Sequence, residues 1–78
     1  MTNLHLVHPI RRDRLIRLEA VIEITGCKKS TIYRLMKEGK FPRNVNVAGR
    51  LSAWPESAVY GWVQEKIQEQ QEANHAQF

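Results

Sequence analysis

The feature that most constrains this chain is a glycine set between two short helical patterns. Leu18, Val21 and Ile22 stand at three- or four-residue spacing, which predicts an amphipathic helix over about residues 19–25. Gly26 ends that helix, because glycine readily adopts the left-handed conformation found after helix C-termini. Only two residues separate this stop from the next helical pattern, so the chain must turn sharply.

A second helix is predicted over about residues 29–38. Its apolar residues Ile32, Leu35 and Met36 stand at i, i+3 and i+4, so they form one buried face. Gly39 then ends the helix. Two short helices joined by a tight, glycine-containing turn predict a helix-turn-helix.

The period changes after the second helix. Over about residues 44–54, Val45 and Val47 alternate with asparagines, and a turn around Gly49 precedes a second alternating stretch, which predicts a β-hairpin. Pro55 suits the first position of a third helix, expected over about residues 55–70. The apolar face of this helix is formed by Val59, Trp62, Val63 and Ile67.

These elements together predict an α+β, mostly α fold, a small winged helix-turn-helix. The predicted order is an N-terminal arm over 1–13, the winged domain over 14–68 and a polar tail over 69–78, where the third helix should fray for lack of residues to bury. A very short strand is expected within residues 14–17, and the aromatic residues Phe41, Trp54 and Trp62 are assigned to the core.

Size and composition narrow the class of protein. A chain of 78 residues is one small domain, and one cysteine excludes an intramolecular disulfide scaffold. No apolar run approaches the ~20 residues that cross a bilayer. The N-terminus lacks a signal-peptide pattern, because its charges follow the short apolar stretch. The sequence therefore indicates a cytoplasmic protein without a membrane partner.

Charge is divided unevenly along the chain. Residues 1–50 carry eleven Lys or Arg against four Asp or Glu, whereas residues 51–78 carry Lys66 against four glutamates. The first part therefore has a net charge of +7 and the second −3, which together give the +4 of the whole chain. A basic N-terminal part suits contact with a phosphate backbone, and an unevenly charged solvated surface is the alternative.

Catalytic chemistry has little support in the sequence. His5 and His8 have a spacing that could touch a metal, but no third ligand stands near them, so free histidines are the favoured interpretation. Cys27 has no histidine neighbour and is interpreted as a small buried apolar residue. No glycine-rich phosphate loop is present. We therefore predict no enzymatic activity, no metal and no cofactor.

Binding to double-stranded DNA has better support. At ~100° per residue, the second helix directs several polar and cationic side chains away from its buried face, and more stand at its N-terminal end. Such a helix can lie in the major groove, and an arginine at the hairpin tip can reach phosphate or a narrow minor groove. The predicted contacts are Lys28, Lys29, Ser30, Thr31, Tyr33, Arg34, Lys37 and Arg50.

The stretch from Arg14 to Trp62 resembles the AlpA family of small phage-type regulators. The resemblance rests on Thr25-Gly26, on the segments 30–35 and 37–42, and on Trp54 followed by Glu56-Ser57, Val59 and Trp62. It implies a MerR-like, excisionase-like winged helix that binds DNA with the second helix and the wing. By position, the resemblance makes Arg50 the wing contact and assigns the recognition-helix contacts to Ser30, Thr31, Tyr33, Arg34 and Lys37. Family members regulate transcription in prophages and genomic islands, some controlling an integrase gene, and relatives act as recombination directionality factors.

One position departs from the family pattern, since Lys28 stands where a serine often caps the recognition helix. Lysine cannot accept a hydrogen bond from the helix N–H groups, so the Thr25 hydroxyl or water is expected to serve instead. The rival to a DNA-binding regulator is an interaction module whose C-terminal helix recruits a recombinase. An integrase or RNA polymerase as partner, and self-association on DNA, are further expectations.

Overall fold

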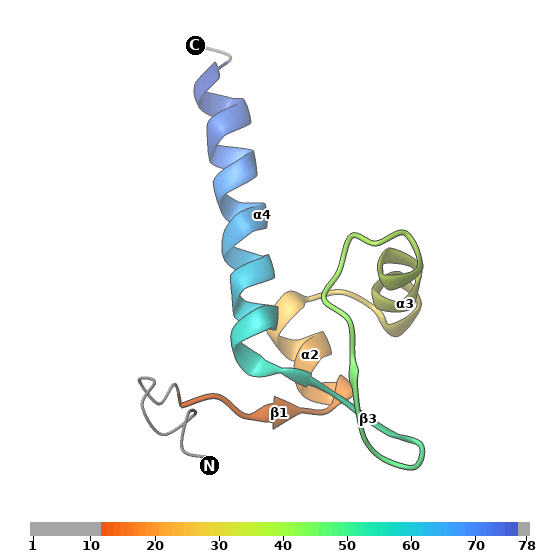
Figure 1. Cartoon of the computed structure of the whole chain (residues 1–78). Helices are drawn as coiled ribbons and strands as arrows, with labels where there is room; N and C mark the ends of the chain where they lie inside the picture. Colours follow the sequence, from red (N-terminus) through yellow and green to blue (C-terminus); the bar gives the residue numbers. More distant parts are fainter. Residues whose placement is uncertain (1–11, 77–78) are drawn as a thin grey trace.

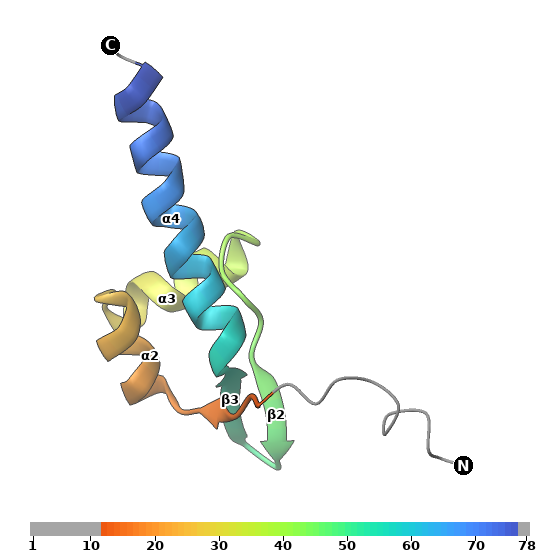
Figure 2. The same cartoon turned by 90° about the vertical axis from the view of Figure 1, so that its left-hand side faces the viewer.

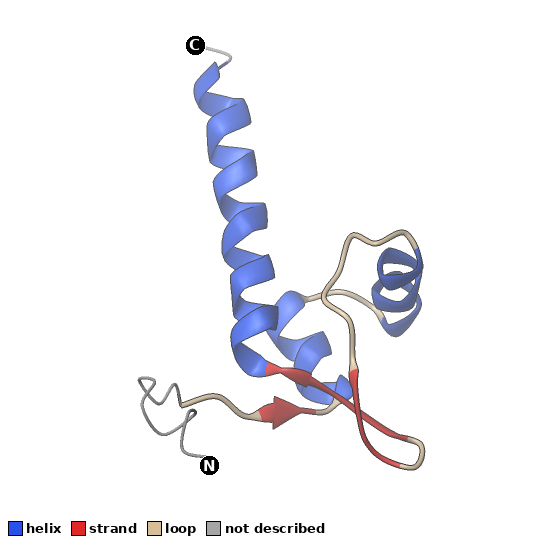
Figure 3. Ribbon diagram, viewed as in Figure 1, coloured by secondary structure: helices blue, strands red, loops and turns tan. Residues whose placement is uncertain are grey.

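The computed structural model describes residues 12–76 and shows a mostly helical α+β fold (Figures 1 and 3). The predicted class, a small winged helix-turn-helix, is confirmed. His5 and His8 lie outside the described residues. In chain order the elements are β1 (Leu15–Ile16), α2 (Leu18–Thr25), α3 (Lys29–Lys37), β2 (Val45–Ala48), β3 (Leu51–Pro55) and α4 (Glu56–Ala76).

The turn between α2 and α3 forms where the sequence predicts it. Gly26 has a φ of 74°, and its N–H donates to the Ile22 carbonyl at 2.8 Å, which closes the last turn of α2. Gly39 also has a φ of 74°, but it stands one residue beyond Glu38, the C-cap of α3, and its N–H donates to the Met36 carbonyl at 3.0 Å. Both positions lie in the left-handed region that glycine tolerates best, so these two residues set the lengths of the helices.

The strands form one antiparallel sheet in the order β1-β3-β2. Leu15 pairs with Pro55 in β1–β3, which confirms the short predicted strand and shows that Pro55 ends a strand, with the helix beginning at Glu56. Ala48 pairs with Leu51 across a two-residue turn. The hairpin of β2 and β3 stands out from the helices (Figure 1). Every residue of β2 is exposed.

A compact cluster of apolar side chains joins the helices to the sheet. Its buried members are Ile16, Val21, Ile32, Phe41, Trp54 and Val59. Trp54 is 1% exposed, and its indole N–H donates to the Pro42 carbonyl at 3.1 Å. Trp62 is only half-buried: its ring packs edge-on against Phe41, and its N–H donates to the Lys40 carbonyl at 2.8 Å. Trp54 is therefore interior, whereas Trp62 closes the edge of the core.

Helix α4 is longer than the sequence analysis predicts. It continues to Ala76, beyond the expected end near residue 70, and its distal half projects past the other elements (Figures 1 and 2). Ile67 is 46% exposed, so the predicted apolar face is buried only in its first turns. The extension is rich in Gln, Glu and Ala, which favour helix without burial. A Lys66–Glu69 ion pair of 3.3 Å adds local support.

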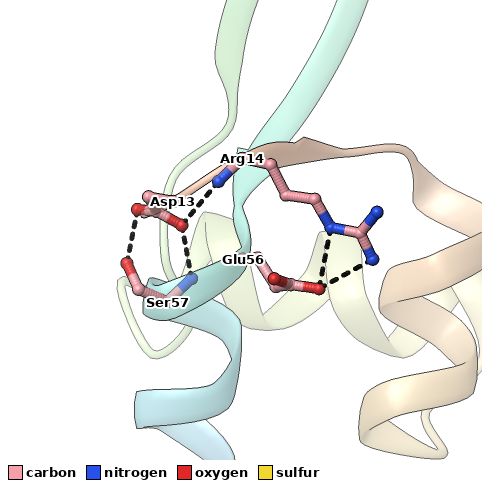
Figure 4. A network of polar contacts seen from close by, with 4 residues as sticks. All are labelled: Asp13, Arg14, Glu56 and Ser57. Atoms are coloured by element: carbon pink, nitrogen blue, oxygen red, sulfur yellow. Dashed lines mark hydrogen bonds and ion pairs between the residues drawn. The ribbon is translucent and has the colours of Figure 1, made fainter. Parts of the chain in front are cut away.

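A polar network fixes the start of α4 to the chain before β1 (Figure 4). The Asp13 carboxylate accepts hydrogen bonds from the Ser57 N–H at 3.0 Å and the Ser57 hydroxyl at 2.6 Å. The Ser57 hydroxyl is the main cause of the lowered pKa of Asp13. Beside it, Arg14 forms an ion pair with Glu56 at 3.0 Å. Asp13, assigned to the arm by sequence, therefore caps α4 from a distant part of the chain.

Among the residues that the structure describes, no helix combines the length and the apolar character needed to cross a membrane.

Candidate nucleic-acid interface

Helix α3 presents one face to the core and the other to solvent. Ile32 is fully buried, and Leu35 and Met36 are half-buried against the core. The predicted contact residues on and before this helix, called here the α3 surface, are Lys28, Lys29, Ser30, Thr31, Tyr33, Arg34 and Lys37. All are exposed except Thr31, which is partly covered. The fold therefore brings these polar and cationic groups together on one accessible helix.

Ion pairs engage only part of the positive charge near α3. Arg34 lies 3.6 Å from Glu38, and Lys40 lies 3.6 Å from the other oxygen of the same carboxylate. The Arg34 side chain is 60% exposed, and exposed pairs of this kind contribute little and are screened by salt. Within residues 12–76, Lys28 and Lys37 form no ion pair. The α3 surface thus keeps a positive charge available to an anionic partner.

The N-terminus of α3 lacks a side-chain cap. Lys28 is the N-cap residue and forms no capping hydrogen bond. The Thr25 hydroxyl, considered as a substitute, instead donates to the Val21 carbonyl at 2.8 Å and accepts from the Cys27 N–H at 3.1 Å. It therefore stabilises the turn and does not cap the helix. The positive end of the α3 dipole stands beside two lysines, which reinforces the local positive potential.

Tyr33 links α3 to the hairpin. Tyr33 is 42% exposed, and its ring meets the Trp54 ring edge-on, with 6.4 Å between ring centroids. Because Trp54 is buried near the end of β3, this contact places Tyr33 of α3 against the base of the hairpin.

The hairpin tip lies on the same side of the molecule as α3 in Figure 1. Gly49 has a φ of 57° and permits the two-residue turn, and Arg50 stands beside it, exposed at the tip. The distal part of α4 projects away from this side. The predicted wing residue therefore stands where a partner that contacts α3 could also reach it.

Sequence reasoning missed Arg43, which follows Phe41-Pro42 in the connection from α3 to β2. A hollow beside α3 is lined by Tyr33, Met36, Lys37 and Arg43. Arg43 is exposed, and the described residues offer it no ion-pair partner. One signal was available, because Arg43 is a further cation of the basic first part of the chain, six residues after Lys37.

The residues considered for catalysis do not assemble into a site within the described part of the chain. Cys27 is half-buried and packs against the core, with its thiol 3.9 Å from the Thr25 carbonyl. No three His, Cys, Asp or Glu residues in that part stand close enough together to hold a metal ion.

Two short helices at a tight turn, followed by a hairpin and a third helix, define a small winged helix-turn-helix protein. Residues 14–67 match the family described as prophage CP4-57 regulatory protein (AlpA). The chain belongs to this family of phage regulatory proteins, which confirms the resemblance that the sequence motifs indicate. It is also 36% identical over 58 residues to the uncharacterized protein ORF88 of Enterobacteria phage P4. That alignment covers 74% of this chain and 66% of the relative's length.

Proposed function

We propose that the protein binds double-stranded DNA in a sequence-specific manner and regulates transcription in a prophage or genomic island. The observation that carries the proposal is the α3 surface, where cations and hydroxyls stand opposite the buried Ile32. An α-helix fits the ~12 Å major groove, and these side chains match base edges and phosphates. Arg50 supplies a second contact from the wing, and the protein acts by binding alone, without a cofactor, in the cytoplasm.

The test is selection of bound sequences from random duplex DNA at physiological salt. The proposal predicts a short consensus of about one major-groove face, since a recognition helix reads only a few base pairs. Recovery of unselected sequences, with binding that depends on salt alone, would contradict it. Placing the selected motif in the genome would then show whether it lies at a promoter, such as that of an integrase gene, or at a recombination site. The second outcome would favour an excisionase-like directionality factor.

A second candidate function rests on α4. Its distal half projects beyond the domain (Figure 2). Two large apolar side chains of α4 are exposed: Tyr60, near the start of the helix, at 48%, and Ile67 at 46%. We infer that this helix serves as a contact for a protein partner, either a recombinase or integrase, RNA polymerase, or a second copy on DNA. Ile67→Ser should leave binding of a single copy to DNA unchanged and weaken recruitment or cooperative binding. Unchanged recruitment and cooperativity would reject this role.

A further inference from the structure

When a winged helix binds duplex DNA, one strand of the DNA backbone lies between its recognition helix and its wing. When a recognition helix lies in the major groove and a wing reaches the adjacent minor groove, the phosphates that separate the two grooves pass between helix and wing. In this protein that place lies between α3 and the hairpin, on the side that both share in Figure 1. A phosphate there would meet side chains from α3 and from the connection to β2.

The hollow beside α3 lies on the side of the helix that carries Tyr33, where the connection from α3 to β2 passes. Met36, half-buried against the core, belongs to its lining, together with Tyr33 and Lys37 from α3 and Arg43 from the connection to β2. Tyr33 is also the residue that touches Trp54 of β3, so the hollow lies on the flank of α3 that faces the hairpin.

The chemistry of the lining fits an anion. Arg43 offers a planar guanidinium, Lys37 an ammonium and Tyr33 a phenolic hydroxyl, and no carboxylate lines the hollow. Neither cation forms an ion pair with another described residue, whereas Arg34 and Lys40 share Glu38. A tetrahedral phosphate can accept hydrogen bonds from three such donors at once.

We propose that this hollow binds a phosphate of the DNA backbone, with Arg43 as its principal ligand and Lys37 and the Tyr33 hydroxyl as further donors. The inference rests on the proposed DNA-binding function and adds to it a contact that carries no sequence information. Its role is to set the register of α3 in the major groove, because phosphate contacts fix orientation whereas base contacts specify sequence.

The test compares Arg43→Gln, Arg43→Lys and Tyr33→Phe with wild type on the selected duplex and on a scrambled one, over a range of salt. One phosphate contact contributes about 0.9 to the slope of log K against log salt. A tenfold fall in salt, from 1 M to 0.1 M, therefore makes that contact worth about eightfold in affinity. Arg43→Gln should lose about this factor on both duplexes and lower the slope by about one. Arg43→Lys should retain the slope, and Tyr33→Phe should lose affinity with little change in slope. Lys66→Gln is the matched control, since it removes one cation from α4, and it should bind like wild type.

A neutral methylphosphonate placed at successive backbone positions identifies the phosphate. At one position the methylphosphonate should weaken the wild type clearly more than it weakens Arg43→Gln, because the variant has already lost the Arg43 contact and keeps only Lys37 and the Tyr33 hydroxyl there. If Arg43→Gln binds like wild type, or weakens only the selected duplex, the phosphate contact is overturned while the proposed function stands. Wild-type protein that binds no duplex DNA would overturn both. Circular dichroism melting checks that each variant is folded.

Discussion

Replacement of Trp62 by alanine tests how α4 is joined to the rest of the domain. The indole ring packs edge-on against Phe41 with 4.9 Å between centroids, and its N–H donates to the Lys40 carbonyl at 2.8 Å. Full burial would make the substitution cost ~3–5 kcal/mol. Because the ring is only half-buried, we expect about half of that loss in the free energy of unfolding. The lost hydrogen bond adds up to ~1 kcal/mol.

The expected loss in the free energy of unfolding is therefore about 2–3 kcal/mol, equivalent to a fall of roughly 10–20 °C in Tm for a domain of this size. Thermal melting followed by circular dichroism measures it. Ile67→Ala is the matched control, because it lies on the same helix and is 46% exposed, and it should stay within ~0.5 kcal/mol of wild type. Trp54→Ala should be more damaging than either, since Trp54 is 1% exposed. A Trp62→Ala melt that coincides with that of Ile67→Ala would refute the packing described for α4.

Three further predictions concern the interface and the cap. Arg34→Ala should lose ~1–3 kcal/mol of binding free energy for the selected DNA and keep the Tm of wild type. If gel-shift titration shows unaltered affinity and specificity, Arg34 does not contact the bases. Arg50→Ala should weaken binding to A·T-flanked and G·C-flanked sites alike and lower the salt slope by about one, whereas no loss on any DNA would exclude the wing. The pKa of Asp13 is lowered from 3.8, mainly by the hydrogen bond from the Ser57 hydroxyl. The Asp13 carboxylate therefore stabilises the folded state fully above its pKa in the unfolded chain, and this stabilisation is lost as pH falls through its lower pKa in the folded protein. Tm measured from neutral to acidic pH should therefore fall less in Asp13→Asn than in wild type; identical pH profiles would count against the cap.

The helix-turn-helix and the hairpin are predictable because local residues determine them. Gly26 and Gly39 adopt left-handed conformations that few other residues tolerate, so the ends of α2 and α3 can be located in the sequence. The exposed side of α3 follows from helical spacing once Ile32 is assigned to the core. These signals need no knowledge of distant parts of the chain.

The features missed by sequence analysis depend on distant contacts or on the absence of burial. Asp13 caps α4 by accepting a hydrogen bond from Ser57, which is 44 positions away in the sequence. No local sequence pattern predicts such a distant partner. Arg43 becomes part of a site only because the connection to β2 passes beside Tyr33 and Lys37. The distal half of α4 buries little, so hydrophobic periodicity could not predict its end, and helix propensity was the better guide.

The central claim, sequence-specific recognition of duplex DNA through α3, is tested most directly by one ratio of affinities. The dissociation constant for a scrambled duplex is divided by that for the selected duplex, both measured with the whole chain at about 0.15 M salt. Specific binders reach ratios of ~10³ or more, and the account predicts a value in that range. A ratio near one, with both affinities falling equally as salt rises, would show that the basic charge alone binds DNA and would contradict recognition by α3.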